Sequence, residues 1–347
     1  MIRPLCAALW LVLLPMSGQA QEAVAHFGSG NTVFVIRSTT DISIFEPVLD
    51  AFIASAPDVE ITYEQWGSNA LHANASAACK NETAPADAVI SSAVHLMVSL
   101  VNRACARPYA SDQTRALPLT RRWRDEIWGF TQEPAVTIYN NQEITPEEVP
   151  VSRFELLDML RESPERFRGK IATYDIEASG LGYLFAYVDS LEATTFGSLL
   201  EGFARSDATA TCCSAEIIDA VSNGDFLIAY NVLGSYVENA KPANVGAILP
   251  EDYTLILSRA YMIPATARNP STSQAFLDFL LSDVGQSILR SVGLIYATDP
   301  AESRIAQSAI RSIPLAPPLL VALDKGTQRD FLMRWRDTFS EPDIDGE

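Results

Sequence analysis

The sequence predicts an α/β protein of two lobes, each a mostly parallel β-sheet flanked by helices. The chain has 347 residues, which is more than one hydrophobic core usually supports, so two lobes of ordinary domain size are expected. Strand and helix patterns alternate along the chain, which favours parallel strands with right-handed crossovers. A long extended stretch over residues 126–140 is followed by a polar segment, and we interpret this as the crossing between the lobes.

Residues 1–20 have the pattern of a cleavable signal peptide. A positive charge at Arg3, an apolar run over residues 5–14 and small residues ending at Ala20 are the three expected parts. The apolar run is too short to span a bilayer. We therefore expect an exported, periplasmic protein without stable membrane insertion.

The charge of the chain limits its partners. The formal net charge is −18 at pH 7, which argues against nucleic acid and against anionic membrane surfaces. A small anionic ligand remains compatible, because helix dipoles and a single arginine act at short range.

The first series of elements places small hydroxyl side chains where a strand ends and a helix begins. Residues 33–38 have a strand pattern, and an apolar stripe that includes Phe45, Val48 and Phe52 predicts the helix after it. Open α/β sheets bind ligands outside the carboxyl ends of their strands, near helix N-termini. Further strands are predicted at residues 59–64 and 86–90, with a helix over 93–102.

A second series follows the crossing. It contains predicted strands at residues 170–175 and 226–231, with a helix between them that carries Tyr183. A return strand is predicted over residues 253–264, followed by helices around 271–281 and 284–291. We expect the chain to finish packed on the first lobe.

Four cysteines follow the signal peptide, an even number that is consistent with disulfides in an oxidising compartment. Cys79 and Cys105 flank one strand and helix unit, and we favour a bond between them. The adjacent Cys212 and Cys213 are compatible with a strained bridge between neighbours, with free thiols or with a place in a cleft. No metal site or other cofactor is predicted, because the cysteines and the three histidines lack ligand spacing.

Several short motifs, in this order, resemble the periplasmic substrate-binding proteins of ABC transporters. The resemblance covers nearly the whole mature chain and is strongest to a subgroup of ferric-ion binders, sugar-phosphate binders and the phosphoglycerate transport regulatory protein. The motifs are Ser38-Thr-Thr-Asp41, Ala86-Asp-Ala-Val-Ile-Ser-Ser92, Val136-Thr-Ile-Tyr-Asn140, Ala178-Ser-Gly-Leu-Gly182, Gly224-Asp-Phe-Leu-Ile-Ala-Tyr-Asn231, and Asn269-Pro before the helix Ala275-Phe-Leu-Asp-Phe-Leu280.

The resemblance implies a two-lobed periplasmic binding protein fold of type 2, with two hinge strands between the lobes. Residues 21–132 and 260–347 would form the first lobe, and residues 133–259 a second, inserted lobe. Such a protein closes over its ligand, because contacts from both lobes exist together only in the closed state. A monomer that delivers its ligand to an ABC permease is implied, and the alternative is a sensor accessory that signals to a membrane histidine kinase.

The resemblance also implies which residues contact the ligand. They follow the strand ends and helix starts described above, and one of them, Glu133, stands at the crossover. They are Ser38, Thr39, Thr40, Ser68, Asn69, Ser91, Ser92, Glu133, Ser179, Gly180, Tyr230 and Asn231. For any single Ser or Thr among them, a helix cap or a turn residue is the better explanation, and their convergence on one cleft is what favours a ligand-binding role for the group.

Arg37 is the cation beside the first of these loops. It is suited to binding a carboxylate or phosphate through two hydrogen bonds, and it is equally suited to pairing with a surface carboxylate.

The expected ligand is a small hydroxylated anion, such as an organic phosphate, a sugar phosphate or a carboxylate. Hydroxyl side chains and helix N-termini suit such a solute. Ferric ion is less expected, because ferric binders use two neighbouring tyrosines and this chain has Tyr230-Asn231 near the matching place. An exported hydrolase is also disfavoured, because the sequence contains neither a Gly-x-Ser-x-Gly nor a His-Glu-x-x-His motif.

Overall fold

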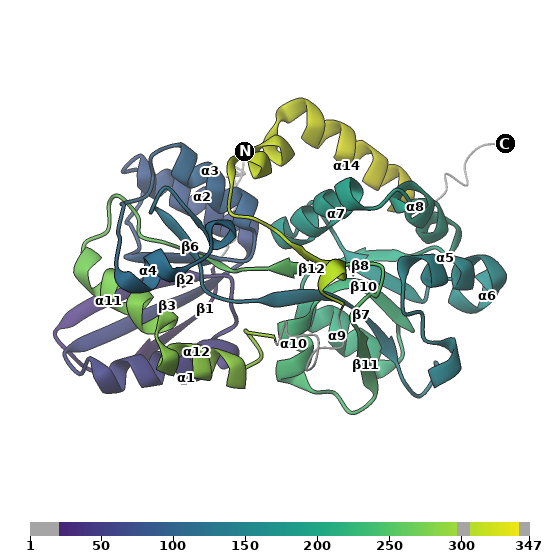
Figure 1. Cartoon of the computed structure of the whole chain (residues 1–347), viewed down its shortest axis with the longest axis horizontal. Coiled ribbons are helices and arrows are strands. Elements are labelled where there is room, and N and C mark those ends of the chain that lie inside the picture. Colours follow the sequence, from purple (N-terminus) through teal and green to yellow (C-terminus); the bar gives the residue numbers. More distant parts are fainter. Residues whose placement is uncertain (1–20, 297–305, 340–347) are drawn as a thin grey trace, which may run out of the picture.

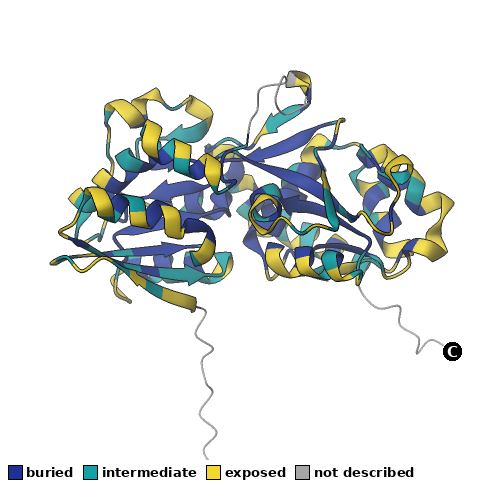
Figure 2. Ribbon diagram, turned by 90° about the horizontal axis from the view of Figure 1, so that it is seen from below, coloured by how far each residue is buried: buried dark blue, intermediate teal, exposed yellow. Residues whose placement is uncertain are grey.

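The computed structural model describes residues 21–296 and 306–339, which form two lobes side by side (Figure 1). Each lobe contains a β-sheet flanked by helices, and Figure 2 shows the central strands buried inside both lobes, whereas edge strands such as β1 are partly exposed. The predicted signal peptide lies outside the described residues. None of the described helices is long and apolar enough to cross a membrane.

The first lobe contains one sheet, with helices on its faces. Its strands are β1 (Gln21–Phe27), β2 (Thr32–Ser38), β3 (Val59–Trp66), β4 (Ala88–Ser91), β5 (Arg122–Trp123), β6 (Ile127–Gly129) and β13 (Ala260–Met262). Its helices are α1 (Ile42–Ser55), α2 (Ser68–Cys79), α3 (Val94–Asn102), α4 (Asp112–Ala116), α11 (Pro270–Leu281), α12 (Asp283–Ser291) and the short 3-10 helix η1 (Leu119–Arg121). The strand order is β1-β3-β2-β4-β13-β6-β5.

The second lobe is built in the same way. Its strands are β7 (Glu133–Asn140), β8 (Ile171–Tyr174), β9 (Thr209–Thr211), β10 (Ile228–Leu233), β11 (Val245–Ile248), β12 (Thr254–Leu257) and β14 (Ile310–Ser312). Its helices are α5 (Arg153–Glu162), α6 (Pro164–Phe167), α7 (Gly180–Glu192), α8 (Phe196–Arg205), α9 (Ser214–Asn223), α10 (Gly234–Ala240) and α14 (Lys325–Phe339), with 3-10 helices η2 (Pro146–Glu148), η3 (Gln307–Ala309) and η4 (Pro317–Leu323). The strand order is β14-β12-β7-β10-β8-β9, and β11 also pairs with β7.

Both sheets are mixed rather than mostly parallel. The parallel part is confined to β3-β2-β4 in the first lobe and β10-β8-β9 in the second, apart from the β12–β14 pair. The crossing strands β7, β12 and β13 enter and leave the lobes in opposite directions, so they pair antiparallel with their neighbours. The predicted strand and helix units therefore describe the centre of each sheet. The remaining antiparallel pairs come from these crossing strands, from β1 with β3, and from β5 with β6.

The core of the first lobe joins residues that are distant in the sequence. Phe34 of β2, Phe45 and Phe52 of α1, and Phe276 of α11 pack together, with ring centroids of Phe52 and Phe276 4.8 Å apart. Burying one such side chain contributes about 1.5–3 kcal/mol to folding. The returning chain after β13 is thus held firmly on the first lobe through α11.

Among the described residues, two connections between strands link the lobes. One runs from β6 to β7 and the other from β12 to β13, where Ser258 and Arg259 lie between the two strands. Glu133, which was expected to contact the ligand, begins β7 and is fully buried at this hinge. Its carboxylate pairs with Arg259, with a distance of 2.9 Å between Arg259 Nη2 and Glu133 Oε2.

Glu133 and Arg259, the hinge pair, also form hydrogen bonds with neighbouring side chains. The hydroxyls of Thr131 and Ser235 each donate to the Glu133 carboxylate over 2.6 Å. Arg259 Nη1 donates to Thr40 Oγ1 over 2.8 Å, so the loop after β2 is tied to the same cluster. A buried ion pair with these partners fixes the two crossings relative to each other and to the first lobe.

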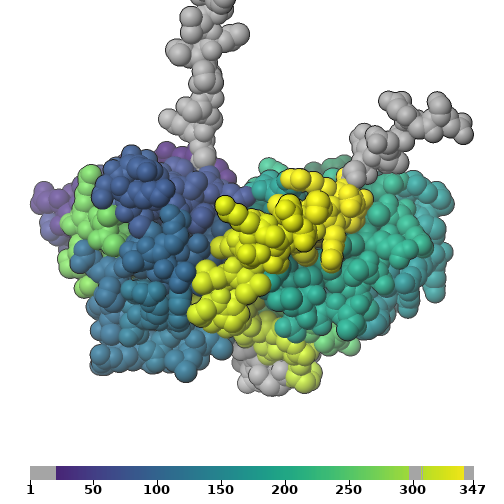
Figure 3. Space-filling model, turned by 90° about the horizontal axis from the view of Figure 1, so that it is seen from above, coloured from purple at the N-terminus to yellow at the C-terminus, as the bar shows by residue number. Residues whose placement is uncertain are grey.

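The end of the described chain packs on the second lobe and across the junction, not on the first lobe alone as expected. β14 pairs with β12, and α14 packs against α8. η4 contacts α3 of the first lobe, and Tyr183 of α7 donates a hydrogen bond to the carbonyl of Ala322 over 2.6 Å. Figure 3 shows this segment in yellow over the seam between the lobes. The aromatic residues of α14, such as Trp335, find their apolar partners on α7 and α8.

We expect Arg259→Met to destabilise the protein, because it leaves the Glu133 carboxylate buried without its charge partner. The expected loss is about 3–5 kcal/mol in the free energy of unfolding, measured by urea denaturation. Arg161→Ala is the control, because Arg161 pairs with Asp158 on the surface and such pairs contribute about 0–1 kcal/mol. Equal losses in both variants would show that the hinge pair has no special role.

The structure confirms the disulfide between Cys79 and Cys105, which links the end of α2 to the chain after α3. The bond spans a sequence separation of 26 residues, so it constrains the unfolded chain. We expect Cys79→Ala with Cys105→Ala to lower the free energy of unfolding by about 3.5 kcal/mol in urea denaturation. An unchanged urea midpoint would contradict this.

Candidate functional site

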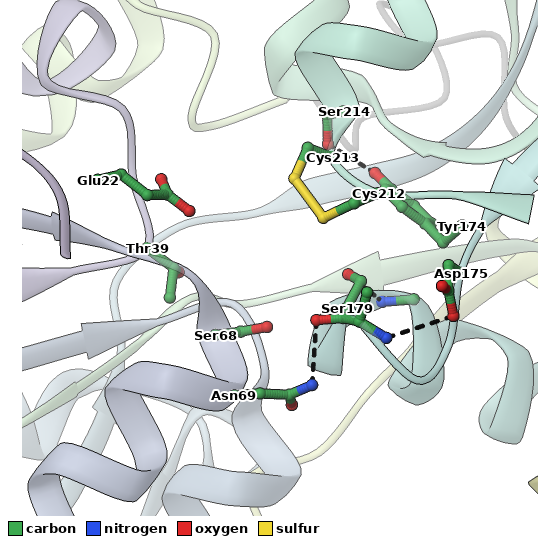
Figure 4. The surroundings of a disulfide bond; sticks show 12 residues. Glu22, Thr39, Ser68, Asn69, Tyr174, Asp175, Ser179, Cys212, Cys213 and Ser214 are labelled. Atoms are coloured by element: carbon green, nitrogen blue, oxygen red, sulfur yellow. Dashed lines mark hydrogen bonds between the residues drawn. A yellow bond between two sulfur atoms is a disulfide. The ribbon is translucent and has the colours of Figure 1, made fainter. Parts of the chain in front are cut away.

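A cleft with a volume of about 400 Å³ lies between the two lobes. Its first-lobe wall consists of Glu22, Thr39, Asp41, Gln65, Trp66, Gly67, Ser68 and Ser92. Its second-lobe wall consists of Tyr174, Ala178, Ser179, Leu181, Cys212, Cys213, Ser214, Ala215, Glu216, Leu233 and Tyr236. Figure 4 shows the two walls facing each other, with Thr39 and Ser68 on one side and Ser179 and the two cysteines on the other.

Five of the described helices begin at this cleft, two from the first lobe and three from the second. The residue that precedes each helix lines the cleft: Asp41 before α1, Gly67 before α2, Ser179 before α7, Cys213 before α9 and Leu233 before α10. The first N–H groups of a helix have no partner within it and form the positive end of its dipole. The cleft therefore offers backbone donors to an anionic group from both sides.

The charged side chains of the cleft are all acidic. Glu22, Asp41 and Glu216 line it, and no Lys or Arg is among its described lining residues. Two of the carboxylates already accept hydrogen bonds: Gln65 Nε2 donates to Glu22 over 3.1 Å, and the Tyr236 hydroxyl donates to Asp41 over 2.8 Å. An anion bound at the helix N-termini would therefore need hydrogen-bond donors of its own, and these donors would have to face the carboxylates.

The lobes contact each other directly beside the cleft, so the structure is a closed form. Asn69 Nδ2 donates to the carbonyl oxygens of Glu177 and Ala178 over 2.9 and 3.0 Å. The backbone N–H of Gly180 donates to Ser68 Oγ over 2.9 Å. The Tyr236 bond to Asp41 adds a third connection between the lobes.

Two phenols lie in the cleft, one at the end of β8 and one on α10. Burial raises the pKa of Tyr174 to about 12, and burial also raises the pKa of Tyr236 well above its usual value. The Tyr174 hydroxyl is hydrogen-bonded to Ser214 Oγ over 2.6 Å and accepts from the N–H of Leu233. Both phenols are therefore neutral hydrogen-bonding groups at pH 7.

Only part of the predicted ligand set lines the cleft, namely Thr39, Ser68, Ser92 and Ser179. Asn69 and Gly180 lie beside it and form the contacts between the lobes. The other predicted residues do not line the cleft. Each of them has another structural role, in which its side chain interacts with a specific partner.

Three of the predicted hydroxyls are buried at the strand ends: Ser38 is the last residue of β2, Ser91 is the last residue of β4, and Thr40 follows β2. Ser38 Oγ accepts from the N–H of Thr40, and Ser91 Oγ accepts from the N–H of Ala93, so both shape the turns that present their neighbours Thr39 and Ser92. Thr40 accepts from Arg259 at the hinge. Together with Glu133, these residues support the cleft without lining it.

Arg37 points away from the cleft. Its guanidinium is 2.8 Å from Glu64 and also donates to Asn74 and to the carbonyl of Ala84. This is the second of the two expected roles, a strand residue paired with a neighbouring carboxylate.

Tyr230 and Asn231 belong to a buried cluster inside the second lobe. The Tyr230 hydroxyl donates to Asp189 over 2.5 Å, and Asn231 Nδ2 is 3.4 Å from the same carboxylate. Arg153 also pairs with Asp189 and is fully buried. Both residues lie within β10 rather than at its end, and their side chains are hydrogen-bonded to Asp189 of α7, a buried carboxylate that requires polar partners.

The sequence analysis missed several cleft residues. Tyr174 ends a predicted strand, so the rule that identified Ser92 would also have identified it. Cys212 and Cys213 were considered for a cleft but not assigned to one. Glu22 follows the predicted cleavage site directly, and no local pattern indicates that β1 would bring it to the cleft. Within the described residues, no group of His, Cys, Asp or Glu is arranged to hold a metal ion.

The comparisons with known proteins identify the class. The model of the bacterial extracellular solute-binding protein family matches residues 33–295, so the chain belongs to this family. No curated protein matches the sequence. Family membership implies a location outside the cytoplasm, solute binding and an ABC permease as partner. The family and the similar structures below are binding proteins rather than enzymes.

Solved structures of the same fold cover nearly the whole chain. The substrate-binding protein of an ABC transporter from Agrobacterium tumefaciens has a TM-score of 0.85 and 29% identity, over 91% of this chain and 98% of that one. AfuA from Actinobacillus pleuropneumoniae, with fructose-6-phosphate bound, has a TM-score of 0.69 and 14% identity, over 90% and 100%. Iron-bound HitA from Pseudomonas aeruginosa has a TM-score of 0.65 and 18% identity, over 88% and 99%. The last two show the two-lobed fold alone.

We expect Tyr236→Phe to shift the protein toward an open form, because it removes the hydrogen bond between α10 and Asp41. The loss of a bond to a charged group should reduce the ratio of closed to open molecules about tenfold. Small-angle X-ray scattering would detect this as a larger radius of gyration. Tyr139→Phe is the matched control, because Tyr139 does not line the cleft, and an equal change in both variants would contradict the role of Tyr236.

Proposed function

We propose that this protein is a periplasmic, monomeric solute-binding component that captures a small anion bearing hydrogen-bond donors and delivers it to an ABC permease. The observation that carries the proposal is the cleft between the lobes, where helix starts from both lobes meet hydroxyl side chains and carboxylates. A monomer suffices, because one chain supplies both walls.

The two chemical parts of the cleft support this ligand class. The starts of α2 and α9 provide N–H donors and positive dipole ends for a carboxylate or phosphate. At the start of α7 the N–H of Gly180 donates to Ser68 and that of Gly182 donates to Ser179, so α7 contributes mainly the positive end of its dipole. Glu22 and Asp41 provide acceptors for hydroxyl or ammonium groups at the other end of the solute. A solute without such donors would bring its charge toward the carboxylates without compensation.

Closure explains how binding is reported to a permease. The bonds from Asn69, Ser68 and Tyr236 are made between lobes, so they exist only in the closed form. A solute that contacts both walls adds to these bonds and raises the closed population.

A thermal-shift assay tests the ligand class. We expect 3-phosphoglycerate, fructose 6-phosphate or L-serine to raise the melting temperature, and glucose and putrescine to leave it unchanged. A solute at a hundred times its dissociation constant adds about 2.7 kcal/mol of stability. Stabilisation by putrescine or glucose alone would contradict the proposal.

Glu22→Gln tests the carboxylate end of the cleft. If Glu22 accepts a hydrogen bond from the solute, the variant should bind about tenfold more weakly in isothermal titration. Glu60→Gln, on the same sheet and outside the cleft, should bind as the wild type does. Tighter binding by Glu22→Gln would mean that the carboxylate only repels the anion.

Ferric ion should not give a tyrosinate complex at pH 7. Tyr174 and Tyr236 have raised pKa values and existing hydrogen-bond partners, so their deprotonation is unfavourable. We expect no visible charge-transfer absorption when ferric citrate is added. A visible band that Tyr174→Phe abolishes would favour an iron-binding function instead.

A further inference from the structure

Cys212 and Cys213 form a disulfide between neighbouring residues in the loop from β9 to α9. Both residues line the cleft. Figure 4 shows their sulfur atoms on the second-lobe wall, across the cleft from Glu22 and Thr39. The bond therefore lies where a solute would be held.

This disulfide contributes little to the stability of the whole fold. Its residues are adjacent, with a sequence separation of 1, whereas Cys79 and Cys105 are separated by 26 residues. Cross-linking stabilises mainly by closing a loop in the unfolded chain, and adjacent residues enclose almost no loop. Its effect must therefore be local.

The local effect is on the start of α9. Cys213 directly precedes this helix and has a backbone φ of 72°, a left-handed conformation that residues other than glycine seldom adopt. The small ring that joins the two side chains restricts the backbone at this point. Reduction removes that restriction and leaves Cys213 free to return to an ordinary conformation.

The start of α9 is tied to the floor of the cleft. Ser214, the first residue of α9, is hydrogen-bonded to Tyr174, and the N–H of Leu233 donates to the same phenol oxygen over 3.1 Å. Ser214, Ala215 and Glu216 all line the cleft. A change at Cys213 would therefore move the N–H donors of α9 and the Tyr174 contact together.

We propose that the Cys212–Cys213 disulfide is an affinity-determining part of the cleft wall, which holds the start of α9 in its binding position. The inference rests on the proposed function, because it assigns a role within the same cleft. It adds that tight solute binding requires the oxidised pair.

The chemistry of the switch is thiol–disulfide exchange with a dithiol. One dithiol thiolate attacks a sulfur of the pair and releases the other cysteine as a thiolate, which leaves a mixed disulfide. The second dithiol sulfur then attacks the first and releases the remaining cysteine, and the dithiol leaves as a cyclic disulfide. Two electrons and two protons pass to the protein, which then carries two thiols. By linkage, a solute that binds the oxidised form more tightly must stabilise that form against reduction by the same factor.

The first test needs no solute. Hydrogen exchange of the wild type is compared with that of Cys212→Ser/Cys213→Ser, and the amide of Ile217, which donates to the Cys213 carbonyl, is expected to exchange at least about tenfold faster in the variant. The amide of Ser273, which donates to the Asn269 carbonyl at the start of α11, is the internal control and should be unchanged, as should the urea midpoint. Unchanged exchange at Ile217 would overturn the proposal.

The second test uses 3-phosphoglycerate, fructose 6-phosphate and L-serine as probes. For any probe that stabilises the wild type, we expect about tenfold weaker binding by the double variant and by wild type reduced with dithiothreitol. The same probe should shift the midpoint potential of the pair by about 30 mV to more negative values per tenfold of affinity. Equal affinity in the oxidised and reduced forms would overturn the inference.

The two proposals can fail separately. If no probe binds the wild type, the proposed ligand class is contradicted, and the exchange measurement still decides whether the disulfide holds α9. If a probe binds both forms equally, the ligand class stands and the role of the disulfide is contradicted. Mass spectrometry of alkylated protein confirms that dithiothreitol has opened this pair and left Cys79–Cys105 intact.

Discussion

The buried ion pair between Glu133 and Arg259 is the constraint on which the arrangement of the lobes depends. Each partner lies on a different crossing, and Thr40 connects the pair to the loop that presents Thr39. Removing either charge would leave the other without compensation in a dry environment, so the pair is kept or lost as a unit. Hydrogen bonds therefore connect the hinge to the first-lobe wall of the cleft. A movement of the lobes at the hinge would also change the position of the loop that carries Thr39.

The cleft combines two kinds of polar surface that suit opposite ends of a solute. Helix starts from both lobes supply positive dipole ends, whereas Glu22, Asp41 and Glu216 supply negative charge. Phosphate, sugar-phosphate and carboxylate binding can be achieved by backbone donors, so the lack of Lys and Arg among the described lining residues is compatible with an anion. The carboxylates make the cleft selective, because they disfavour an anion that cannot donate hydrogen bonds in return.

The two disulfides act at different scales because they enclose loops of different length. Cys79–Cys105 constrains the unfolded chain, while Cys212–Cys213 constrains one turn at the edge of the cleft. The terminal segment adds a further connection, since η4 contacts the first lobe and α14 packs on the second (Figure 3). The lobes are thus in contact on several sides of the cleft.

The sequence by itself determined the strand and helix units, the place of the crossings and the hydroxyl residues at strand ends, because hydrophobic periodicity and helix-start chemistry are local properties. Thr39, Ser68, Ser92 and Ser179, which the family resemblance implied as ligand contacts, are among these hydroxyl residues and line the cleft. Only the tertiary structure decided which strand ends face the cleft: Tyr230 and Asn231 turn inward to Asp189, Arg37 turns to Glu64, and Glu133 is taken up by the hinge. Glu22, Tyr236 and α14 reach their positions through partners distant in the sequence. Long-range pairing of buried polar groups depends on the whole fold, and no local pattern encodes it.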